Sequence, residues 1–188
     1  GEVAMDIGRM MARKEQVVKE LTDNVRKLLE AHKVEILHGT ATLAGKDRVE
    51  VAGDLPRTLE ARNIILATGS EPASVPGIPF DGQRIVSSTE ALQFDAVPRT
   101  LGVIGGGYIG IELGSVWLRL GAKVTVIEML PDIVSTMDGQ VNRRLLRVLK
   151  KQGFDFSLES RVQGEQAYGE KVQVAVEAAG RTETLEFD

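Results

Sequence analysis

Residues 101–128 constrain the fold of this chain more than any other segment, because apolar runs and glycines alternate there at fixed spacings. The segment contains, in order, Leu101–Ile104, Gly105, Gly107, Gly110, Val124–Ile127 and Glu128. Glycines directly after one apolar run, and an acidic residue about twenty positions later at the end of a second run, are typical of a strand, helix, strand unit. The sequence therefore predicts two parallel strands joined by a helix.

Each glycine in this unit has a separate physical role. Gly105 allows the chain to turn sharply out of the first strand, and Gly107 allows backbone to approach a pyrophosphate closely. Gly110 allows the helix to lie against the sheet, and the helix N-terminus offers free N–H donors and a partial positive charge to phosphates. The competing interpretation is a purely structural glycine turn. The flanking strands and the terminal acid favour a dinucleotide site.

The composition excludes several other classes of function. The net charge of −4 argues against a general affinity for nucleic acid or for a membrane surface, because the chain has no basic excess. No apolar stretch approaches the roughly 20 residues that span a bilayer. With no cysteine and only two histidines, we expect no disulfide, no thiol catalysis and no histidine-based metal site. A globular protein in the cytoplasm fits these features best.

The first part of the chain has the pattern of a helix followed by short strands. Apolar residues recur every three or four positions in the helical segment, and alternate or run together in the strands. The predicted helix is Met10–His32, and the predicted strands are Lys33–Leu37, Asp47–Ala52, Arg57–Ala61 and Ile64–Ala67. The last of these is wholly apolar, so we expect it to be a buried strand.

The region after residue 72 begins with prolines and glycines and then becomes regular again. Ser87 or Ser88 is expected to cap a short helix through Leu92. Beyond the nucleotide unit, the pattern predicts a helix that ends at Gly153, a strand over Phe154–Leu158, and a C-terminal hairpin with its turn at Ala179 and Gly180. The proline-rich stretch marks the expected domain boundary.

Several motifs together resemble those of the dihydrolipoamide dehydrogenase family of flavin-dependent disulfide reductases. They are GGGYIGIELGSVWLRLGAKVTVIE, NIILATGSEP, PGIPFDG, IVSSTEAL, MLPDIVSTMD and the N-terminal RMMARKEQVVKELTDNV. The resemblance implies an α/β, Rossmann-like three-layer dinucleotide-binding fold that is incomplete. Residues 1–72 would be the C-terminal part of an FAD-binding domain, with its helix, β-meander and ATGS strand. Residues 73–188 would be a truncated NAD-binding domain.

The same resemblance implies that this chain is an internal fragment. The family has an N-terminal flavin motif, a CxxxxC redox pair and a C-terminal interface domain, and none of these is present in the sequence. In the parent enzyme, lipoamide thiols would reduce the disulfide, the disulfide would reduce FAD, and FAD would pass hydride to NAD. The parent would be a homodimer within a 2-oxoacid dehydrogenase complex. The isolated chain is expected to be inactive, because no thiolate is available.

The residues expected to contact NAD follow from the βαβ unit and from the resemblance. At the end of the second strand, Glu128 can accept hydrogen bonds from the ribose hydroxyls and repel a 2′-phosphate, which favours NAD over NADP. The resemblance places Tyr108 and Glu112 near the nicotinamide and includes Ile109 among the residues that bind the cofactor. The competing interpretations are a surface glutamate at Glu128, simple packing at Tyr108 and a solvated helix glutamate at Glu112.

Two further segments resemble parts of the family's flavin site, of which only a part would be present. Gly39, Thr40 and Ala41 correspond to a stretch that reads the adenine, and Thr68 and Gly69 to backbone that approaches the flavin dinucleotide. The competing interpretation is that each segment is a glycine-containing exit from a strand. With half of the site missing, we expect the chain not to retain flavin.

Other functions stay open from the sequence alone. A stand-alone NAD-sensing module would need only the βαβ unit. A related flavin disulfide reductase with another substrate also stays open, because the redox segment and the C-terminal domain that would identify the substrate are absent from this sequence. A last alternative is that the chain misfolds or swaps segments in isolation, because missing sheet neighbours would leave strand edges and apolar surface open.

Overall fold

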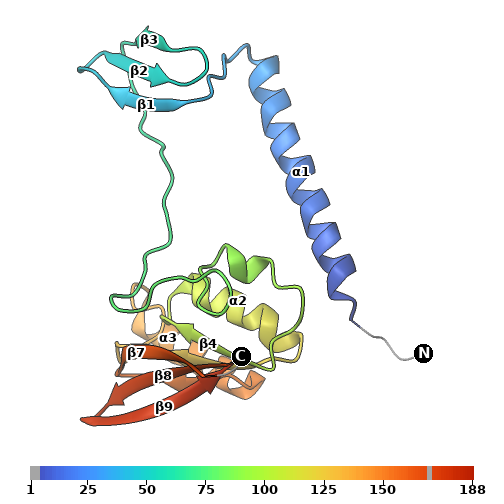
Figure 1. Ribbon diagram of the computed structural model, residues 1–188, viewed down its shortest axis with the longest axis vertical. Helices are drawn as coiled ribbons and strands as arrows, with labels where there is room; N and C mark the ends of the chain where they lie inside the picture. The colour runs from blue at the N-terminus through green and yellow to red at the C-terminus, as the bar shows by residue number, and fades with distance from the viewer. Residues whose placement is uncertain (1–4, 169–170) are drawn as a thin grey trace. The chain divides into compact units, whose positions relative to one another are not determined.

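The computed structural model describes residues 5–168 and 171–188 of the chain (Figure 1). It divides into two compact units. One unit contains residues 72–188 together with the described residues up to Met11, and the other contains residues 12–71. The assignment of the two units to a nicotinamide domain and a flavin domain stays a prediction.

The unit of residues 72–188 is built on the predicted strand, helix, strand arrangement. Its parallel sheet has the strand order β4-β5-β6, and two helices connect the strands. The elements are β4 (Thr100–Ile104), α2 (Tyr108–Arg119), β5 (Lys123–Ile127), α3 (Gly139–Gln152) and β6 (Asp155–Ser157). The parallel pairing of β4 with β5 confirms that the glycine-rich segment is a βαβ unit.

Three layers form because β5 has buried apolar side chains on both faces. On one face, Val124 and Val126 pack in a core that includes Trp117 of α2 and Leu149 of α3. On the other face, Ile127 packs against valines of a second, antiparallel sheet. Successive side chains of a strand point to opposite faces, so Val126 and Ile127 need cover on opposite sides of the sheet. The order of layers is helices, parallel sheet and antiparallel sheet.

The antiparallel layer contains the predicted hairpin and one strand that the sequence pattern missed. Its strands are β7 (Ser160–Tyr168), β8 (Lys171–Ala178) and β9 (Arg181–Phe187), in that order. β7 has a register shift between Val162 and Gly164. A bulge of this kind interrupts the alternation of apolar and polar residues, which is why the pattern did not predict the strand.

Local sequence determines where the helices of this unit end. Asp138 caps α3, because its Oδ1 accepts from the amides of Gln140 at 2.8 Å and Val141 at 3.4 Å. Gly153 ends α3 with a φ of 106°, a left-handed conformation that favours glycine. The short helix predicted near Ser87 is a single 3-10 turn, η1 (Glu90–Leu92).

The unit of residues 12–71 contains most of α1 (Ile7–Ala31) and a three-stranded meander. The strands are β1 (Thr40–Leu43), β2 (Arg48–Ala52) and β3 (Arg57–Glu60), with antiparallel pairing of neighbours. The predicted helix and the two predicted strands that became β2 and β3 are therefore present. The helix is amphipathic, but none of its residues is buried.

Two strand predictions in this unit are wrong. Lys33–Leu37 is irregular, and the strand of this region is β1 instead. Ile64–Ala67 forms no strand, and Ile65 is 89% exposed. A wholly apolar strand is stable only between sheet neighbours, and among the described residues no strand pairs with this segment. Within the described ranges, the model has no helix that is both long and apolar enough to cross a membrane.

Candidate nucleotide-binding site

The glycine loop lies where β4 ends and α2 begins. The Gly105 amide still donates to the Ile127 carbonyl of β5 at 2.9 Å, so the loop starts directly at the sheet edge. Gly105 has a φ of 104°, and a residue with a side chain would be strained there. The carboxyl ends of the parallel strands and the N-terminus of α2 meet at this position, where α/β sheets bind their ligands.

The other two motif glycines differ in what surrounds them. A Cβ on Gly110 would lie 2.6 Å from the Gly105 carbonyl oxygen and 2.9 Å from Cγ1 of Val103, so only glycine permits this helix-to-strand contact. A Cβ on Gly107 would meet nothing within 4 Å. Gly107 is also the N-cap of α2 and makes no side-chain cap. The space beside Gly107 at the N-terminus of α2 is thus open, as the close approach of an anion requires.

Glu128 is fixed beside the glycine loop by two backbone amides. Its Oε2 accepts from the Gly106 amide at 2.6 Å, and its Oε1 accepts from the Leu130 amide at 2.8 Å. The side chain is half-buried. Both bonds hold the carboxylate close to the N-terminus of α2, where the helix dipole favours negative charge. An acid held in this way is a preorganised acceptor for hydroxyl groups of a ligand.

Sequence reasoning missed Gly106, the middle glycine of the run. A Cβ there would lie 3.2 Å from Glu128 Oε2 and 3.1 Å from Cγ2 of Ile133. The Gly106 carbonyl also accepts from the Val134 amide at 2.8 Å. The sequence did contain an indication that position 106 needs glycine. The dinucleotide motif requires only the first and third of the three consecutive glycines, so the middle one called for a separate explanation.

The segment after β5 covers the glycine loop from one side. Ile133 is fully buried, whereas Met129 and Leu130 are exposed. Val134 has a φ of 42°, an unfavourable conformation for a β-branched residue. Strain of this kind persists only where the surrounding contacts hold it, here the bond from the Val134 amide to Gly106.

Tyr108 and Glu112, which are expected near the nicotinamide, and Ile109, which is expected to contact the cofactor, lie on the first turns of α2. Tyr108 is 65% exposed and Ile109 is 49% exposed. Glu112 is also exposed. None of them packs into the described core, so their surfaces are available to a ligand. Their nicotinamide role stays a prediction.

The residues expected to contact flavin lie in the other unit. Thr40 and Ala41 belong to β1 and pair with β2, and a Cβ on Gly39 would lie 2.2 Å from the Ala52 carbonyl oxygen. Thr68 and Gly69 lie in an irregular exposed segment. Within the described part of the chain, no hydrogen bond or strand pairing joins the two segments. The structure therefore does not assemble them into a site.

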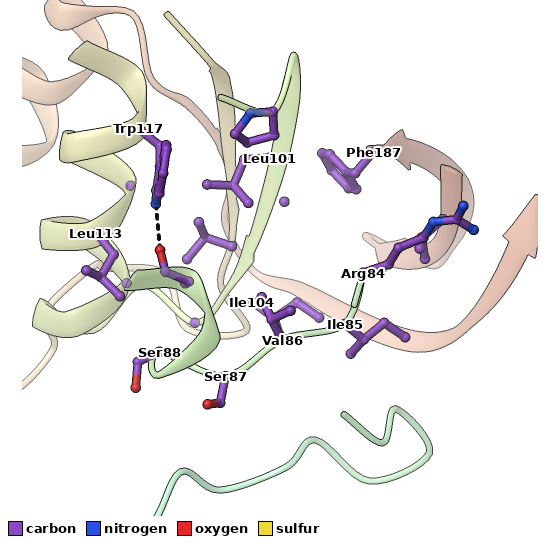
Figure 2. Close-up of a pocket in the computed structure, with 18 of the residues that line it drawn as sticks. Arg84, Ile85, Val86, Ser87, Ser88, Leu101, Ile104, Leu113, Trp117 and Phe187 are labelled. Carbon is purple, nitrogen blue, oxygen red and sulfur yellow. Dashed lines mark hydrogen bonds between the residues drawn. The ribbon is translucent and has the colours of Figure 1, made fainter. Parts of the chain in front are cut away.

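An apolar cleft of about 650 Å³ extends from the glycine loop along β4 (Figure 2). Leu113 and Trp117 of α2 line one side, and the Trp117 indole Nε1 donates to the Ala91 carbonyl at 3.0 Å. Phe94 packs against Trp117 with ring centroids 5.0 Å apart. The cleft has a volume typical of ligand pockets, but its lining is mostly aliphatic and aromatic.

Acidic residues elsewhere in this unit have structural partners. Glu90 accepts hydrogen bonds from the Ser87 hydroxyl at 2.6 Å and the Ser87 amide at 2.8 Å, and these bonds lower the pKa of Glu90. This is a reciprocal cap, since the Thr89 amide donates to Ser87 Oγ at 3.1 Å. Among the residues that the structure describes, no three His, Cys, Asp or Glu side chains gather as a metal site would need.

The comparison with protein families gives one match that covers almost the whole chain. Residues 2–188 match the model of the pyridine nucleotide-disulphide oxidoreductases. This match includes both units and the glycine loop between β4 and α2.

Individual relatives point to the same group. The chain is 48% identical to dihydrolipoyl dehydrogenase 3 of Pseudomonas aeruginosa, over 98% of this chain and 40% of the relative. It is 43% identical to the mitochondrial dihydrolipoyl dehydrogenase of Caenorhabditis elegans, over 98% of this chain and 38% of the relative. Among solved structures, the HOCl-induced flavoprotein disulfide reductase RclA from Escherichia coli has a TM-score of 0.79 at 28% identity, over 98% of this chain and 41% of that one. The chain thus spans about two fifths of the length of these proteins.

Proposed function

Since this chain belongs to the pyridine nucleotide-disulphide oxidoreductase family, we propose that it is the NAD-binding part of a dihydrolipoyl dehydrogenase, with part of the FAD-binding domain. The parent enzyme would oxidise dihydrolipoamide and reduce NAD through FAD and a redox disulfide. The relatives at 43% and 48% identity support this choice within the family.

The observation that carries the NAD assignment is the position of Glu128. Its carboxylate is held by the Gly106 amide, directly beside the open N-terminus of α2. A pyrophosphate at the α2 amides would leave the adenosine ribose within reach of this carboxylate. Its negative charge would repel a 2′-phosphate, so NAD is favoured over NADP.

The residues of this chain would bind and orient NAD. The amides of Gly107 and the first turn of α2 would hold the phosphates, and Glu128 would accept from the ribose hydroxyls. Tyr108, Ile109 and Glu112 are proposed to lie along the nicotinamide half of the molecule. Bound NAD would supply the carbon that accepts hydride, and the protein would supply its orientation.

The flavin assignment has weaker support. Gly39 meets the Ala52 carbonyl too closely for a side chain, which accounts for this glycine without any cofactor. Thr40, Ala41, Thr68 and Gly69 would contact FAD only after further chain completes the site. The isolated chain is proposed to be inactive, because it contains no cysteine to supply the redox thiolate.

The remaining properties of the parent are proposals of the same kind. It would act as a homodimer, serve a 2-oxoacid dehydrogenase complex, and reside in the cytoplasm. One observation favours a second candidate, a related flavin disulfide reductase with another substrate. RclA, an HOCl-induced flavoprotein disulfide reductase from Escherichia coli, shares the fold over 98% of this chain.

Calorimetric titration of the chain with NADH and NADPH tests the NAD assignment. We expect the dissociation constant of NADH to be at least about tenfold lower than that of NADPH, because a charged hydrogen bond contributes about 1.5–3 kcal/mol. Glu128→Gln should remove most of this difference between the two nucleotides. Glu183→Gln, an exposed glutamate on β9, is the matched control and should bind as the original chain does. Tighter binding of NADPH would contradict the role of Glu128. No heat with either nucleotide would contradict nucleotide binding by this chain.

A further inference from the structure

The helix α3 concentrates positive charge on its solvent-exposed side. Its 14 residues include five arginines and lysines and no acidic residue, in a chain whose net charge is −4. All five basic side chains are exposed, and they are Arg143, Arg144, Arg147, Lys150 and Lys151. Within the described residues, none of the five forms an ion pair with a carboxylate. Direct contacts in the described chain therefore leave this charge uncompensated.

The stability of the helix does not account for this charge. Lys150 and Lys151 lie in the last turn, where the helix dipole favours cations. Arg143 and Arg144 lie in the second turn, where the dipole gives no such benefit. Like charges also recur at four-residue spacing, from Arg143 to Arg147 and on to Lys151, and such pairs destabilise a helix. A partner of opposite charge would relieve this repulsion.

Exposed apolar side chains border the basic residues. Val141 is 49% exposed and Val148 is 44% exposed, and residues seven positions apart lie on one side of a helix. Arg144 lies beside Val148, because residues four apart are neighbours on a helix surface. The opposite side of α3, which includes Leu149, is packed in the core. The exposed surface, named here the α3 face, consists of Val141, Arg143, Arg144, Arg147, Val148 and Lys151.

The mixture of charged and apolar groups limits which anionic partner fits the α3 face. A nucleic acid presents phosphates but offers little apolar surface to Val141 and Val148, and the net negative charge of the chain repels a polyanion. An amphipathic helix binds an anionic membrane by inserting its apolar side, but the apolar side of α3 is packed in the core. A protein segment can supply carboxylates and apolar side chains together.

The spacing of the charges favours a helix as that segment. Arg143, Arg147 and Lys151 follow one another by four residues, a rise of about 6 Å along the helix axis. Acidic residues at every fourth position of a second helix repeat with the same rise, and apolar residues beside them would meet the two valines. A second copy of this chain supplies no such helix from its described residues, because α1 contains more basic than acidic residues and α2 contains one glutamate.

We infer that the α3 face is a docking surface for an acidic amphipathic helix of another protein. Carboxylates of the partner would pair with the guanidinium groups of the face, and its apolar side chains would cover Val141 and Val148. The charge attraction would mainly speed association. No residue of the α3 face lines the cleft at the glycine loop, so this docking does not depend on the proposed nucleotide site.

Fluorescence anisotropy with a dye-labelled synthetic peptide tests this surface. The peptide has about 18 residues, or five helical turns, with glutamate at every fourth position, leucine beside each glutamate and alanine elsewhere. We expect it to bind the chain, and to bind roughly tenfold more weakly when glutamine replaces its glutamates. Raising the salt concentration from about 0.05 to 0.3 M should weaken binding several-fold, because salt screens exposed charges.

A charge reversal in the protein locates the binding. Arg147→Glu should weaken peptide binding by about fivefold or more, and it places a carboxylate four residues from both Arg143 and Lys151, which supports the helix. The matched control is Arg181→Glu, the same charge change at an exposed position of β9, and it should alter binding by less than about twofold.

A second pair of variants tests the apolar part of the α3 face without changing charge. Val148→Ser should weaken peptide binding by about twofold to threefold, because it removes apolar surface that the peptide leucines cover. Val18→Ser, at a 48% exposed position of α1, is the control and should bind the peptide as the original chain does.

Several results would overturn the inference. They are no binding of the peptide, equal binding of its glutamine version, equal losses with Arg147→Glu and Arg181→Glu, or tighter binding of duplex DNA or phosphatidylserine vesicles than of the peptide. NADH titration at Glu128 is a separate measurement, so failure of one proposal leaves the other standing.

Discussion

The two units of this chain differ in how much apolar surface they bury. In residues 72–188, a continuous core includes Trp117, Val124, Val126 and Phe154. In the described residues of 12–71, Val51 is the one buried side chain. Both units form their predicted amphipathic helices and most of their predicted strands, although Lys33–Leu37 and Ile64–Ala67 form none, so the difference lies in partners. Strands and helices form from local pattern, but a core forms only where a second layer is present.

The helix α1 illustrates the unit that buries less apolar surface. Its apolar stripe includes Val18, Leu21, Val25 and Leu28, and their exposed fractions are 48–60%. The stripe identifies the helix and also the face that a partner would cover. In the other unit, α2 and α3 have comparable stripes that the parallel sheet covers. The predictions below test whether burial, and not pattern, separates the two units.

The largest expected effect is the loss of the Trp117 side chain. Trp117 is 2% exposed, packs on Phe94 and donates to the Ala91 carbonyl. Trp117→Ala should lower the free energy of unfolding of its unit by about 3–5 kcal/mol, measured by urea titration of the β5 amide signals. Leu21 lies in the unit of residues 12–71. Leu21→Ala should change the free energy of unfolding of that unit by under about 0.5 kcal/mol, as expected for an exposed position. Equal effects would erase the distinction between the units.

The next effect separates two glycines of the same loop. Gly110→Ala brings a Cβ to 2.6 Å from a carbonyl oxygen, so it should destabilise the unit by about 1–3 kcal/mol. Gly107→Ser has open space and adds a favourable N-cap, so stability should rise by a few tenths of a kcal/mol. Both variants should weaken NADH binding in calorimetry. If Gly107→Ser binds NADH unchanged, the phosphates do not lie at Gly107.

A smaller effect is expected at the cap of α3. Asp138→Ala removes the acceptor for the amides of Gln140 and Val141, and should cost about 1 kcal/mol of unfolding free energy. Asp138→Asn retains an acceptor oxygen and should lower the free energy of unfolding by only a few tenths of a kcal/mol. Thermal unfolding followed by circular dichroism measures both variants. A large loss with asparagine would indicate that the charge, and not the cap bond, stabilises the helix.

The smallest effect is a response of the Asp188 contact to pH. Burial raises the pKa of Asp188, but the hydrogen bond from the Thr100 amide and the charge of Arg99 outweigh it and hold the pKa below its ordinary value. A carboxyl with a lowered pKa contributes its stability fully above the unfolded pKa, near 4, and loses it as the pH falls through the folded value. The protection of the Thr100 amide, which is the intrinsic exchange rate at the same pH relative to the measured rate, should therefore fall in acid. Asp188→Asn should remove that dependence, and an unchanged profile would contradict the assignment.

Local sequence was sufficient to predict an element where its apolar residues recur at a regular spacing and a cap or turn residue marks its end. The β4, α2 and β5 unit, the end of α3 at Gly153, and the β8–β9 hairpin were all predicted from spacing. The sharp turn at Gly105 and the close contact at Gly110 were also predicted from residue type, whereas the roles of Gly107 and Glu128 toward a nucleotide stay predictions.

Contacts between distant segments decided the rest. The apolar run at Ile64–Ala67 has the composition of a strand, but among the described residues no strand pairs with it and it forms none. The bonds that fix Glu128 to Gly106, and those that join Asp188 to Thr100, link residues 22 and 88 positions apart. Periodicity reports the faces of single elements, whereas these contacts depend on which elements become neighbours. The sequence by itself thus determined most of the elements and the residue types of the loop, and only the tertiary structure decided which residues are buried, paired or left at an open edge.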